Sequence, residues 1–180
     1  MKIEKTNIND CIIIKPKFYN DQRGFFMETF RQNEFERHCG KYSFVQDNHS
    51  FTKKYVLRGL HFQKKPFSQG KLVECITGEI YDVIVDIRKG SETYLQWGFV
   101  ILSENNNKQL WIDSGFAHGF YTLSESAHLI YKVDNFYNKK SEQTIIWNDT
   151  QLSIKWPLIN KEPIISQKDL EGKSIKELIL

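Results

Sequence analysis

Two stretches set the pattern for the whole chain: Arg58-Gly59-Leu60-His61-Phe62-Gln63 and, shortly after it, Gln69-Gly70-Lys71-Leu72-Val73. Polar and apolar residues are interleaved in the first, and the second opens a β-rich run. Leu57, Leu60 and Phe62 are therefore predicted to face a hydrophobic core. Glycines beside the polar residues indicate places where the backbone approaches another strand or a ligand closely.

The polar residues of these stretches carry the first functional signal. They are predicted to share a surface formed by two neighbouring strands, and they are Arg58, His61, Gln63 and Lys71. A histidine between two cations favours its neutral form, which suits a general base near neutral pH. The cations suit an anionic ligand or negative charge that develops during a reaction. The alternative is a pair of strands with a solvated polar face.

Composition points to a single β-rich domain. The chain has 180 residues, enough for one domain (residues 1–180) with a substantial core. Its aromatic fraction of 14% is high, with 13 Phe, 8 Tyr and 4 Trp, which favours strands over helices. A formal net charge of +3, without any basic run, excludes a nucleic-acid-binding protein.

The cysteines and the N-terminus indicate a soluble cytoplasmic protein. Cys11, Cys39 and Cys75 are odd in number and lack metal-type spacing, which fits a reducing compartment and argues against disulfides or a zinc site. Met1–Asp10 has no apolar signal core, and no stretch is long enough to span a membrane.

Short strands separated by Gly/Asn turns are predicted along most of the chain. Strands recurring at this spacing are typical of a sandwich or barrel. The predicted strands are 11–18 (stopped near Pro16), 25–30, 72–76, 80–87, 97–102, 109–112, 119–123, 128–133 and 143–147, with extended chain over 42–50. Turn residues occupy 19–24.

Two helices are predicted. Asn33 as N-cap, Glu36 three residues later and Gly40 as C-cap predict a short helix over 34–39. The tail is predicted to be helical over 171–180, although Gly172 weakens this prediction.

Other chemistry-bearing residues leave alternatives open. His118, in Gly115-Phe116-Ala117-His118-Gly119-Phe120, is either a functional residue or a satisfied core histidine. Tyr131 and Tyr137, six apart, lie on one face of a strand if that strand continues, either as proton donors or in aromatic packing. Asp149 resembles a turn residue and Asp169 a helix start. A metal site is disfavoured because Gln63 stands two residues after His61, where a second histidine ligand is expected.

Taken in order, the motifs resemble one family, the dTDP-4-dehydrorhamnose 3,5-epimerases of the cupin jelly-roll class. The resemblance covers nearly the whole chain. Its motifs are Asp21-x-Arg23-Gly24-x-Phe26-x-Glu28, Gln46-x-Asn48-x-Ser50, Arg58-Gly59-Leu60-His61, Gln69-Gly70-Lys71-Leu72-Val73, Asp82-Val83-x-Val85-Asp86-Ile87-Arg88-x-Gly90-Ser91, Gly115-Phe116-Ala117-His118-Gly119-Phe120, Tyr131, Tyr137, Trp147-Asn148-Asp149, Ile154-x-Trp156-Pro157 and Ser166-x-Lys168-Asp169.

The resemblance implies an all-β cupin-type jelly roll, a double-sheet sandwich with a few short helices. It also implies an isomerase that inverts C3 and C5 of dTDP-4-keto-6-deoxy-D-glucose through an enolate, without cofactor or metal. By resemblance His61 is the base, Asp169 orients it, Tyr131 is the acid and Lys71 stabilises the enolate oxygen.

The resemblance further implies a set of substrate-binding residues and a partner. The residues are Arg23, Phe26, Glu28, Gln46, Asn48, Arg58, His118, Tyr137, Glu142 and Lys168. The family's N-terminal strand crosses to a second subunit, so a homodimer is expected. Glu92 and Asp113-Ser114 stand where the family usually has proline, which affects turn geometry rather than chemistry.

Three other functions stay open on the sequence alone. One is a relative that inverts only C3 or only C5, or that acts on another nucleotide-linked 4-keto sugar. Another is a metal-dependent cupin enzyme. The third is a non-catalytic sugar-binding jelly roll, against which His61, Lys71 and Tyr131 together argue.

Overall fold

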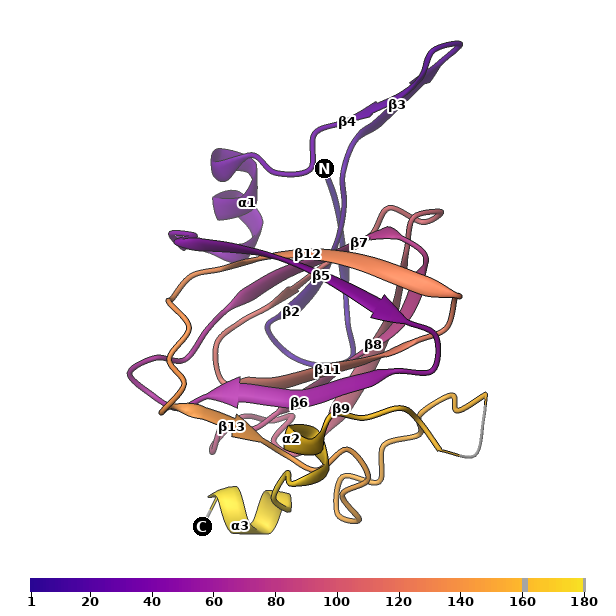
Figure 1. The fold of residues 1–180 in the computed structure, drawn as a ribbon. Helices are drawn as coiled ribbons and strands as arrows, with labels where there is room; N and C mark the ends of the chain where they lie inside the picture. The colour runs from indigo at the N-terminus through magenta and orange to yellow at the C-terminus, as the bar shows by residue number, and fades with distance from the viewer. Residues whose placement is uncertain (160–161, 180) are drawn as a thin grey trace.

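In the computed structural model, which describes residues 1–159 and 162–179, two antiparallel sheets pack face to face (Figure 1). The six-stranded sheet runs, in spatial order, β1 (Lys2–Lys5), β2 (Cys11–Lys15), β10 (Gln109–Ile112), β7 (Lys71–Thr77), β12 (Ser126–Val133) and β5 (Gln46–Lys53). The five-stranded sheet runs β13 (Glu142–Thr144), β6 (Leu57–Gln63), β11 (Phe116–Thr122), β8 (Glu79–Asp86) and β9 (Trp97–Ser103). The predicted all-β double-sheet architecture is confirmed.

A separate hairpin projects from this body. It consists of β3 (Phe18–Asp21) and β4 (Gly24–Met27) and extends away from both sheets (Figure 1). The predicted turn over 19–24 was therefore too long, because β3 continues to Asp21 and only Gln22-Arg23 form the tip. The predicted strand over 25–30 ends at Met27.

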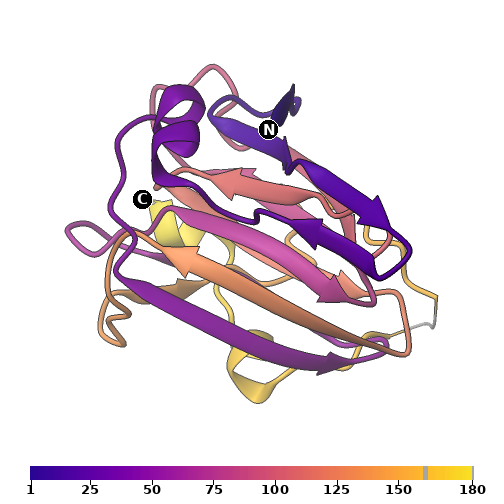
Figure 2. The ribbon, with the colours of Figure 1, turned by 90° about the horizontal axis from the view of Figure 1, so that it is seen from above.

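Short helices cover the outer faces of the two sheets. α1 (Gln32–Cys39) lies over the six-stranded sheet, seen face-on in Figure 2, while α2 (Gln167–Leu170) and α3 (Ile175–Ile179) lie under the five-stranded one (Figure 1). Phe35 of α1 is fully buried, with its ring centroid 5.0 Å from that of Trp111.

The predicted helix ends were partly wrong. Asn33 is not the N-cap of α1, because the first turn closes earlier, where the Phe35 amide donates to the Arg31 carbonyl at 3.0 Å. Gly40 ends the helix as expected, with φ of 95°. After Ser166 the tail forms two short helices, α2 and α3, rather than one helix from Glu171. Gly172 lies between them and packs against the backbone of Ile146. The predicted end at Leu180 lies outside the described residues.

The apolar residues form a core between the sheets, a second one beneath the five-stranded sheet and a smaller cluster under α1 around Phe35 and Trp111. The core between the sheets contains Val73, Ile84 and Leu102, and it lies toward β2, β10, β8 and β9. The second core is covered by the C-terminal segment and contains the buried Leu57 and Leu60 with the partly buried Phe62, as predicted.

The prediction that His61 and Lys71 share a surface formed by two neighbouring strands was wrong. β6 and β7 belong to different sheets, so Lys71 faces His61 across the interior of the sandwich rather than along one sheet. Among the described residues no helix is long and apolar enough to cross a membrane.

Candidate active site

A pocket opens between the sheets at the edge formed by β5, β6 and β13. It has an outer cavity of about 290 Å³ and an inner cavity of about 180 Å³, which share His61, Lys71 and Tyr131. The outer cavity is also lined by Gln46, Asn48, Gln63, Gln69, Tyr137 and Glu142, and the inner one by Ser50, Arg58, Val73, His118, Phe120 and Leu129.

Two glycines set the spacing of the strands under the pocket. Gly59, at φ of 121°, lies against Gly119, and a Cβ on Gly59 would stand 2.5 Å from the Gly119 Cα. A Cβ on Gly119 would in turn meet the Arg58 carbonyl oxygen at 2.6 Å. Only glycine at both positions allows this approach, which places His61 and His118 opposite each other across β6 and β11.

His61 is held by a buried carboxylate. Its Nε2 lies 2.6 Å from Oδ1 of Asp169 in α2, while Oδ2 of Asp169 accepts the Gly59 amide at 3.2 Å. Burial raises the pKa of Asp169, but its contacts with His61 and Gly59 more than offset this, so the pKa lies below its ordinary value. An ionised carboxylate only accepts hydrogen bonds, so Nε2 carries the proton and Nδ1 keeps its lone pair.

Lys71 reaches the pocket from the opposite sheet. Burial lowers the pKa of Lys71 to about 8, against the opposing charges of Asp82 and Glu142. Among the described residues, no carboxylate lies within 4.0 Å of its ammonium group. Such a cation is poorly compensated until a negative charge enters the pocket.

Tyr131 also comes from the six-stranded sheet. Burial raises the pKa of Tyr131, with the nearby charge of Arg58 opposing the shift, so the phenol stays protonated at neutral pH. Arg58 is fixed in turn, because its Nε donates to Thr52 Oγ1 at 3.0 Å. Tyr137 lies beyond the end of β12 at Val133, so the prediction that Tyr131 and Tyr137 share one strand was wrong. Both tyrosines nevertheless line the outer cavity.

The mouth of the pocket is a hydrogen-bonded polar rim. Gln46 Nε2 donates to Asn48 Oδ1 at 2.7 Å, and Gln46 Oε1 accepts the Tyr137 amide at 3.2 Å. The Tyr137 hydroxyl donates to Glu142 at 2.9 Å, and Lys168 pairs with the same carboxylate. Burial raises the pKa of Glu142, but the contacts with Lys168 and Tyr137 more than offset it, so this carboxylate is ionised.

Three of the expected binding residues lie apart from the pocket. Arg23, at the tip of the hairpin, contacts only Asp21 among the described residues, and Phe26 is 68% exposed. Glu28 pairs with Arg31 rather than with a pocket residue. The same chain therefore does not bring these side chains to its own pocket.

Sequence reasoning missed two polar groups in or beside the inner cavity. Asp82 is fully buried and pairs with His118, whose Nε2 lies 2.8 and 2.9 Å from its two carboxylate oxygens. The signal available was an acidic residue inside the aliphatic run 80–87. Ser50 carries a buried hydroxyl without a hydrogen-bond partner among the described residues.

Gln63 is committed to the backbone around the pocket. Its amide donates to the carbonyls of Phe67 and Phe136 at 2.6 and 3.2 Å and its oxygen accepts the Asn138 amide at 2.6 Å. Within residues 1–159 and 162–179, no cluster of three or more His, Cys, Asp or Glu side chains has a metal-binding arrangement.

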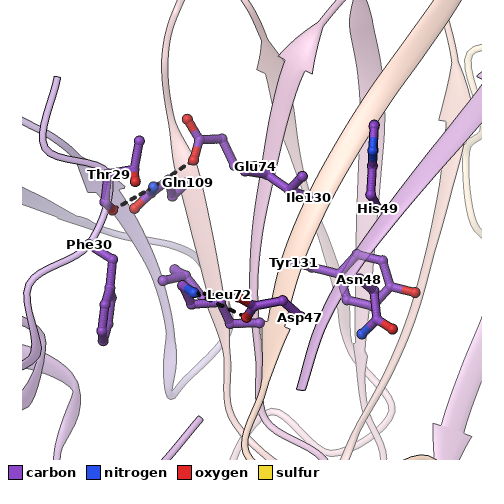
Figure 3. Close-up of a pocket in the computed structure, with 11 residues that line it drawn as sticks. Thr29, Phe30, Asp47, Asn48, His49, Leu72, Glu74, Gln109, Ile130 and Tyr131 are labelled. Carbon is purple, nitrogen blue, oxygen red and sulfur yellow. Dashed lines mark hydrogen bonds and ion pairs between the residues drawn. The ribbon is translucent and has the colours of Figure 1, made fainter. Parts of the chain in front are cut away.

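Another cavity lies on the outer face of the six-stranded sheet (Figure 3). Glu74 and Gln109 form its polar end, with Gln109 Nε2 donating to Glu74 and to the Thr29 carbonyl, both at 2.8 Å. Burial raises the pKa of Glu74. The rest of its lining mixes apolar residues such as Phe30 and Ile130 with polar ones such as Asp47 and Lys132, and no histidine–carboxylate pair is present among the residues that line it.

Comparison with known proteins places this geometry in a family. The family model for dTDP-4-dehydrorhamnose 3,5-epimerase matches residues 5–177. The dTDP-4-dehydrorhamnose 3,5-epimerase of Shigella flexneri is 52% identical over 174 residues, covering 96% of this chain and 95% of the relative.

Solved structures agree with the sequence match. The crystal structure of the epimerase from Elizabethkingia anophelis has a TM-score of 0.95 at 44% identity, covering 100% of this chain and 99% of that one. The epimerase from Legionella pneumophila, in complex with dTDP-4-keto-L-rhamnose, has a TM-score of 0.94 at 47% identity, covering 99% and 96%. The predicted cupin-like architecture is thereby confirmed, and the chain belongs to the dTDP-4-dehydrorhamnose 3,5-epimerase family.

Proposed function

We propose that this chain is an isomerase that inverts C3 and C5 of dTDP-4-keto-6-deoxy-D-glucose to give dTDP-4-keto-L-rhamnose. One arrangement carries the proposal: His61 of the five-stranded sheet, paired with Asp169 of α2, faces Tyr131 and the partly buried Lys71 of the six-stranded sheet. The complex of the Legionella relative with dTDP-4-keto-L-rhamnose supports the substrate class.

Proton transfer is assigned to groups on opposite walls of the pocket. Nδ1 of His61 takes the proton from the carbon beside the C4 ketone, and Asp169 stabilises the imidazolium that results. The electron pair of the broken C–H bond moves to the C4 oxygen, forming an enolate. Tyr131 then returns a proton from the other face, which inverts the carbon. Exchange with solvent water removes the proton from His61 and reprotonates Tyr131, and the same sequence then follows at the second carbon.

Lys71 is assigned to the enolate oxygen. A desolvated ammonium without a close carboxylate interacts more strongly with a developing oxyanion than with a neutral ketone. Arg58, fixed by Thr52, is suited to a diphosphate oxygen because a guanidinium donates two parallel hydrogen bonds. The rim residues Gln46, Asn48, Tyr137, Glu142 and Lys168, with His118 deeper inside, are assigned to the rest of the nucleotide-sugar.

The hairpin is assigned to a neighbouring copy. Arg23 and Phe26 are exposed and extend away from their own pocket, which supports a homodimer in which each hairpin completes the partner's site, with Glu28 at the base of the arm. The three free cysteines support a cytoplasmic enzyme, since reducing conditions keep thiols unpaired. We further assign residues 1–180 to a single catalytic domain.

Deuterium incorporation tests the reaction. The protein is incubated in D₂O with dTDP-4-keto-6-deoxyglucose, and C3 and C5 are followed by NMR. The expected result is label at both carbons, lost in His61→Asn. Label at one carbon would identify a single-centre epimerase, and no label at either would contradict the proposal for this sugar.

Two further measurements address the alternative functions. Activity that a chelator removes and a transition metal restores would favour a metal-dependent cupin enzyme. Tight binding of the nucleotide-sugar without any turnover would favour a sugar-binding jelly roll.

Mixed dimers test the exchange of the hairpin. Arg23→Ala and His61→Asn are each expected to be inactive alone. After dissociation and random reassociation, half of the dimers contain one intact site, so activity should return to about a quarter of the wild-type value. Absence of recovery, with dimers shown by light scattering, would contradict the exchange.

A further inference from the structure

His118, which lines the inner cavity beside His61, forms a second histidine–carboxylate pair with Asp82 behind the cavity wall. His118 and His61 are register partners on β11 and β6, and each directs Nε2 toward its own aspartate, Asp82 or Asp169. The two pairs differ in burial, because the side chain of His118 is 12% exposed and that of His61 is 28% exposed. The first pair supplies the base, and the second has no assigned role.

Asp82 occupies a costly place for a carboxylate. Its neighbours along the inward face of β8 are Ile80 and Ile84, both fully buried in the apolar core. Its only hydrogen-bond partner among the described residues is His118, although an ionised carboxylate accepts several hydrogen bonds. Burying such a charge is strongly unfavourable unless it is compensated. An aliphatic side chain would continue the row, so the fold alone does not require Asp82.

The charge of Asp82 acts on the ammonium group of Lys71 without forming an ion pair with it. Burial lowers the pKa of Lys71, and the negative charge of Asp82 opposes this lowering more strongly than that of Glu142 does. The two groups are farther apart than an ion pair, so Asp82 acts on Lys71 through space and leaves the ammonium free for a ligand. Besides Glu142, the other charged or titratable groups that line the two cavities with Lys71 are Arg58, His61, His118, Tyr131 and Tyr137.

We propose that Asp82 is a positioning residue of the epimerase, which orients His118 and holds Lys71 in its cationic form. Because Nε2 of His118 donates to Asp82, Nδ1 of His118 is the nitrogen left to accept a hydrogen bond from the sugar. The negative potential of Asp82 stabilises the ammonium form that the enolate requires. The expected effect on turnover rests on the proposed function. The expected effect on the protonation of Lys71 does not.

The test compares Asp82→Asn with a matched variant, Asp86→Asn. Both aspartates are fully buried on β8, but the partner of Asp82 is the pocket residue His118, whereas Asp86 pairs with Arg88, Ser91 and Thr93, which do not line the pocket. The amide keeps the size of the side chain and removes its charge. In Asp82→Asn the alkaline limb of kcat should move down by about one pH unit, with kcat reduced more than KM is raised. Asp86→Asn should lower thermal stability and leave the alkaline limb of the kcat profile at the same pH as in the wild type.

A second readout does not depend on turnover. Acetylation of Lys71 by acetic anhydride, followed by peptide mapping at neutral pH, should be several-fold faster in Asp82→Asn, because only the neutral amine reacts. His118→Asn provides the second variant, and it should weaken substrate binding while leaving the reactivity of Lys71 largely unchanged. An unchanged pH limb or unchanged acetylation in Asp82→Asn would overturn the proposal. Absent turnover in the wild type would instead refute the proposed function.

Discussion

The interior of the sandwich has an apolar half and a polar half, although the same strands build both. β7 contributes Cys75 to the apolar core and Lys71 to the pocket, and β12 likewise contributes Ala127 to the core and Tyr131 to the pocket. The apolar half lies toward β2, β10, β8 and β9, and the polar half toward β5, β6 and β13.

This difference separates stability from chemistry. Burial of aliphatic side chains stabilises the fold by roughly 25 cal/mol per Å² of apolar surface. The polar half contains the lysine and carboxylates that are unfavourable to bury, yet desolvation is what makes them effective toward a developing charge. Substitutions in the two halves should therefore have opposite signatures.

The largest effect is expected for the general base. His61→Asn should reduce kcat by about 10²–10⁴, because the general-base contribution is lost while the hydrogen bond to Asp169 can be kept by the amide. Single-turnover kinetics measure the loss, and circular dichroism with thermal melting checks the fold. If the variant melted at a much lower temperature than the wild type, His61 would contribute to stability as well as to chemistry, which would contradict the proposed difference between the two halves.

Replacement of the buried cation should also affect chemistry more than stability. Lys71→Met is expected to lower kcat by about 10²–10³, as for loss of an oxyanion-stabilising donor. The free energy of unfolding should stay level or rise by about 1 kcal/mol, since a desolvated charge is replaced by an apolar chain of similar length. Urea denaturation measures the second quantity, and a marked drop would place Lys71 among the residues that stabilise the fold.

The apolar half should show the reverse. Leu102 on β9 is fully buried in the core between the sheets, so Leu102→Ala should cost about 2–5 kcal/mol of unfolding free energy. The kcat of the folded fraction should not change. A selective loss of kcat without loss of stability would break the comparison.

Lys71 should also give activity and stability opposite pH dependences. Its ammonium form is lost as pH rises through about 8, so activity should fall there. In the unfolded chain the same group titrates near 10.5, so between pH 8 and 10.5 the unfolded state binds more protons. The contribution of Lys71 to stability therefore rises with pH in the window where activity declines. Paired kcat profiles and urea midpoints test this, with Lys71→Met as the control without either trend.

The smallest effects concern two buried hydroxyls. Ser50 Oγ and Thr122 Oγ1 both lack a hydrogen-bond partner among the described residues, but only Ser50 lines the pocket. Removing an unsatisfied hydroxyl should leave stability level or slightly raised, by less than about 1 kcal/mol, in both Ser50→Ala and Thr122→Val. Only Ser50→Ala should raise KM, by a few-fold. Equal KM values for the two variants would indicate that Ser50 does not contact the substrate.

Much of the fold was predictable because strand signals are local. Alternating apolar residues and Gly/Asn turns located most strands within a few residues, and the glycines beside His61 and His118 marked the close approach of β6 and β11. β1 and β3 were missed because their sequences are polar or exposed and gain their order by pairing with β2 and β4.

The candidate site was predictable only in part. The resemblance named His61, Lys71 and Tyr131, and all three line one pocket. It did not single out Asp82, which stands in the apolar run 80–87 and whose full burial beside His118 marks it as unusual. Arg23 was also named, yet its own chain leaves it far from this pocket and exposed at a hairpin tip.

The sequence by itself determined which side chains are available and, through alternation along each strand, which of them share a face. Only the tertiary structure decided that Lys71 stands across the sandwich from His61, and that Asp169, 108 residues from His61, is its partner. The physical reason is that chemical type and strand periodicity are local properties. Sheet partners, burial and electric field depend on contacts between segments far apart in the chain, and these contacts exist only in the folded protein.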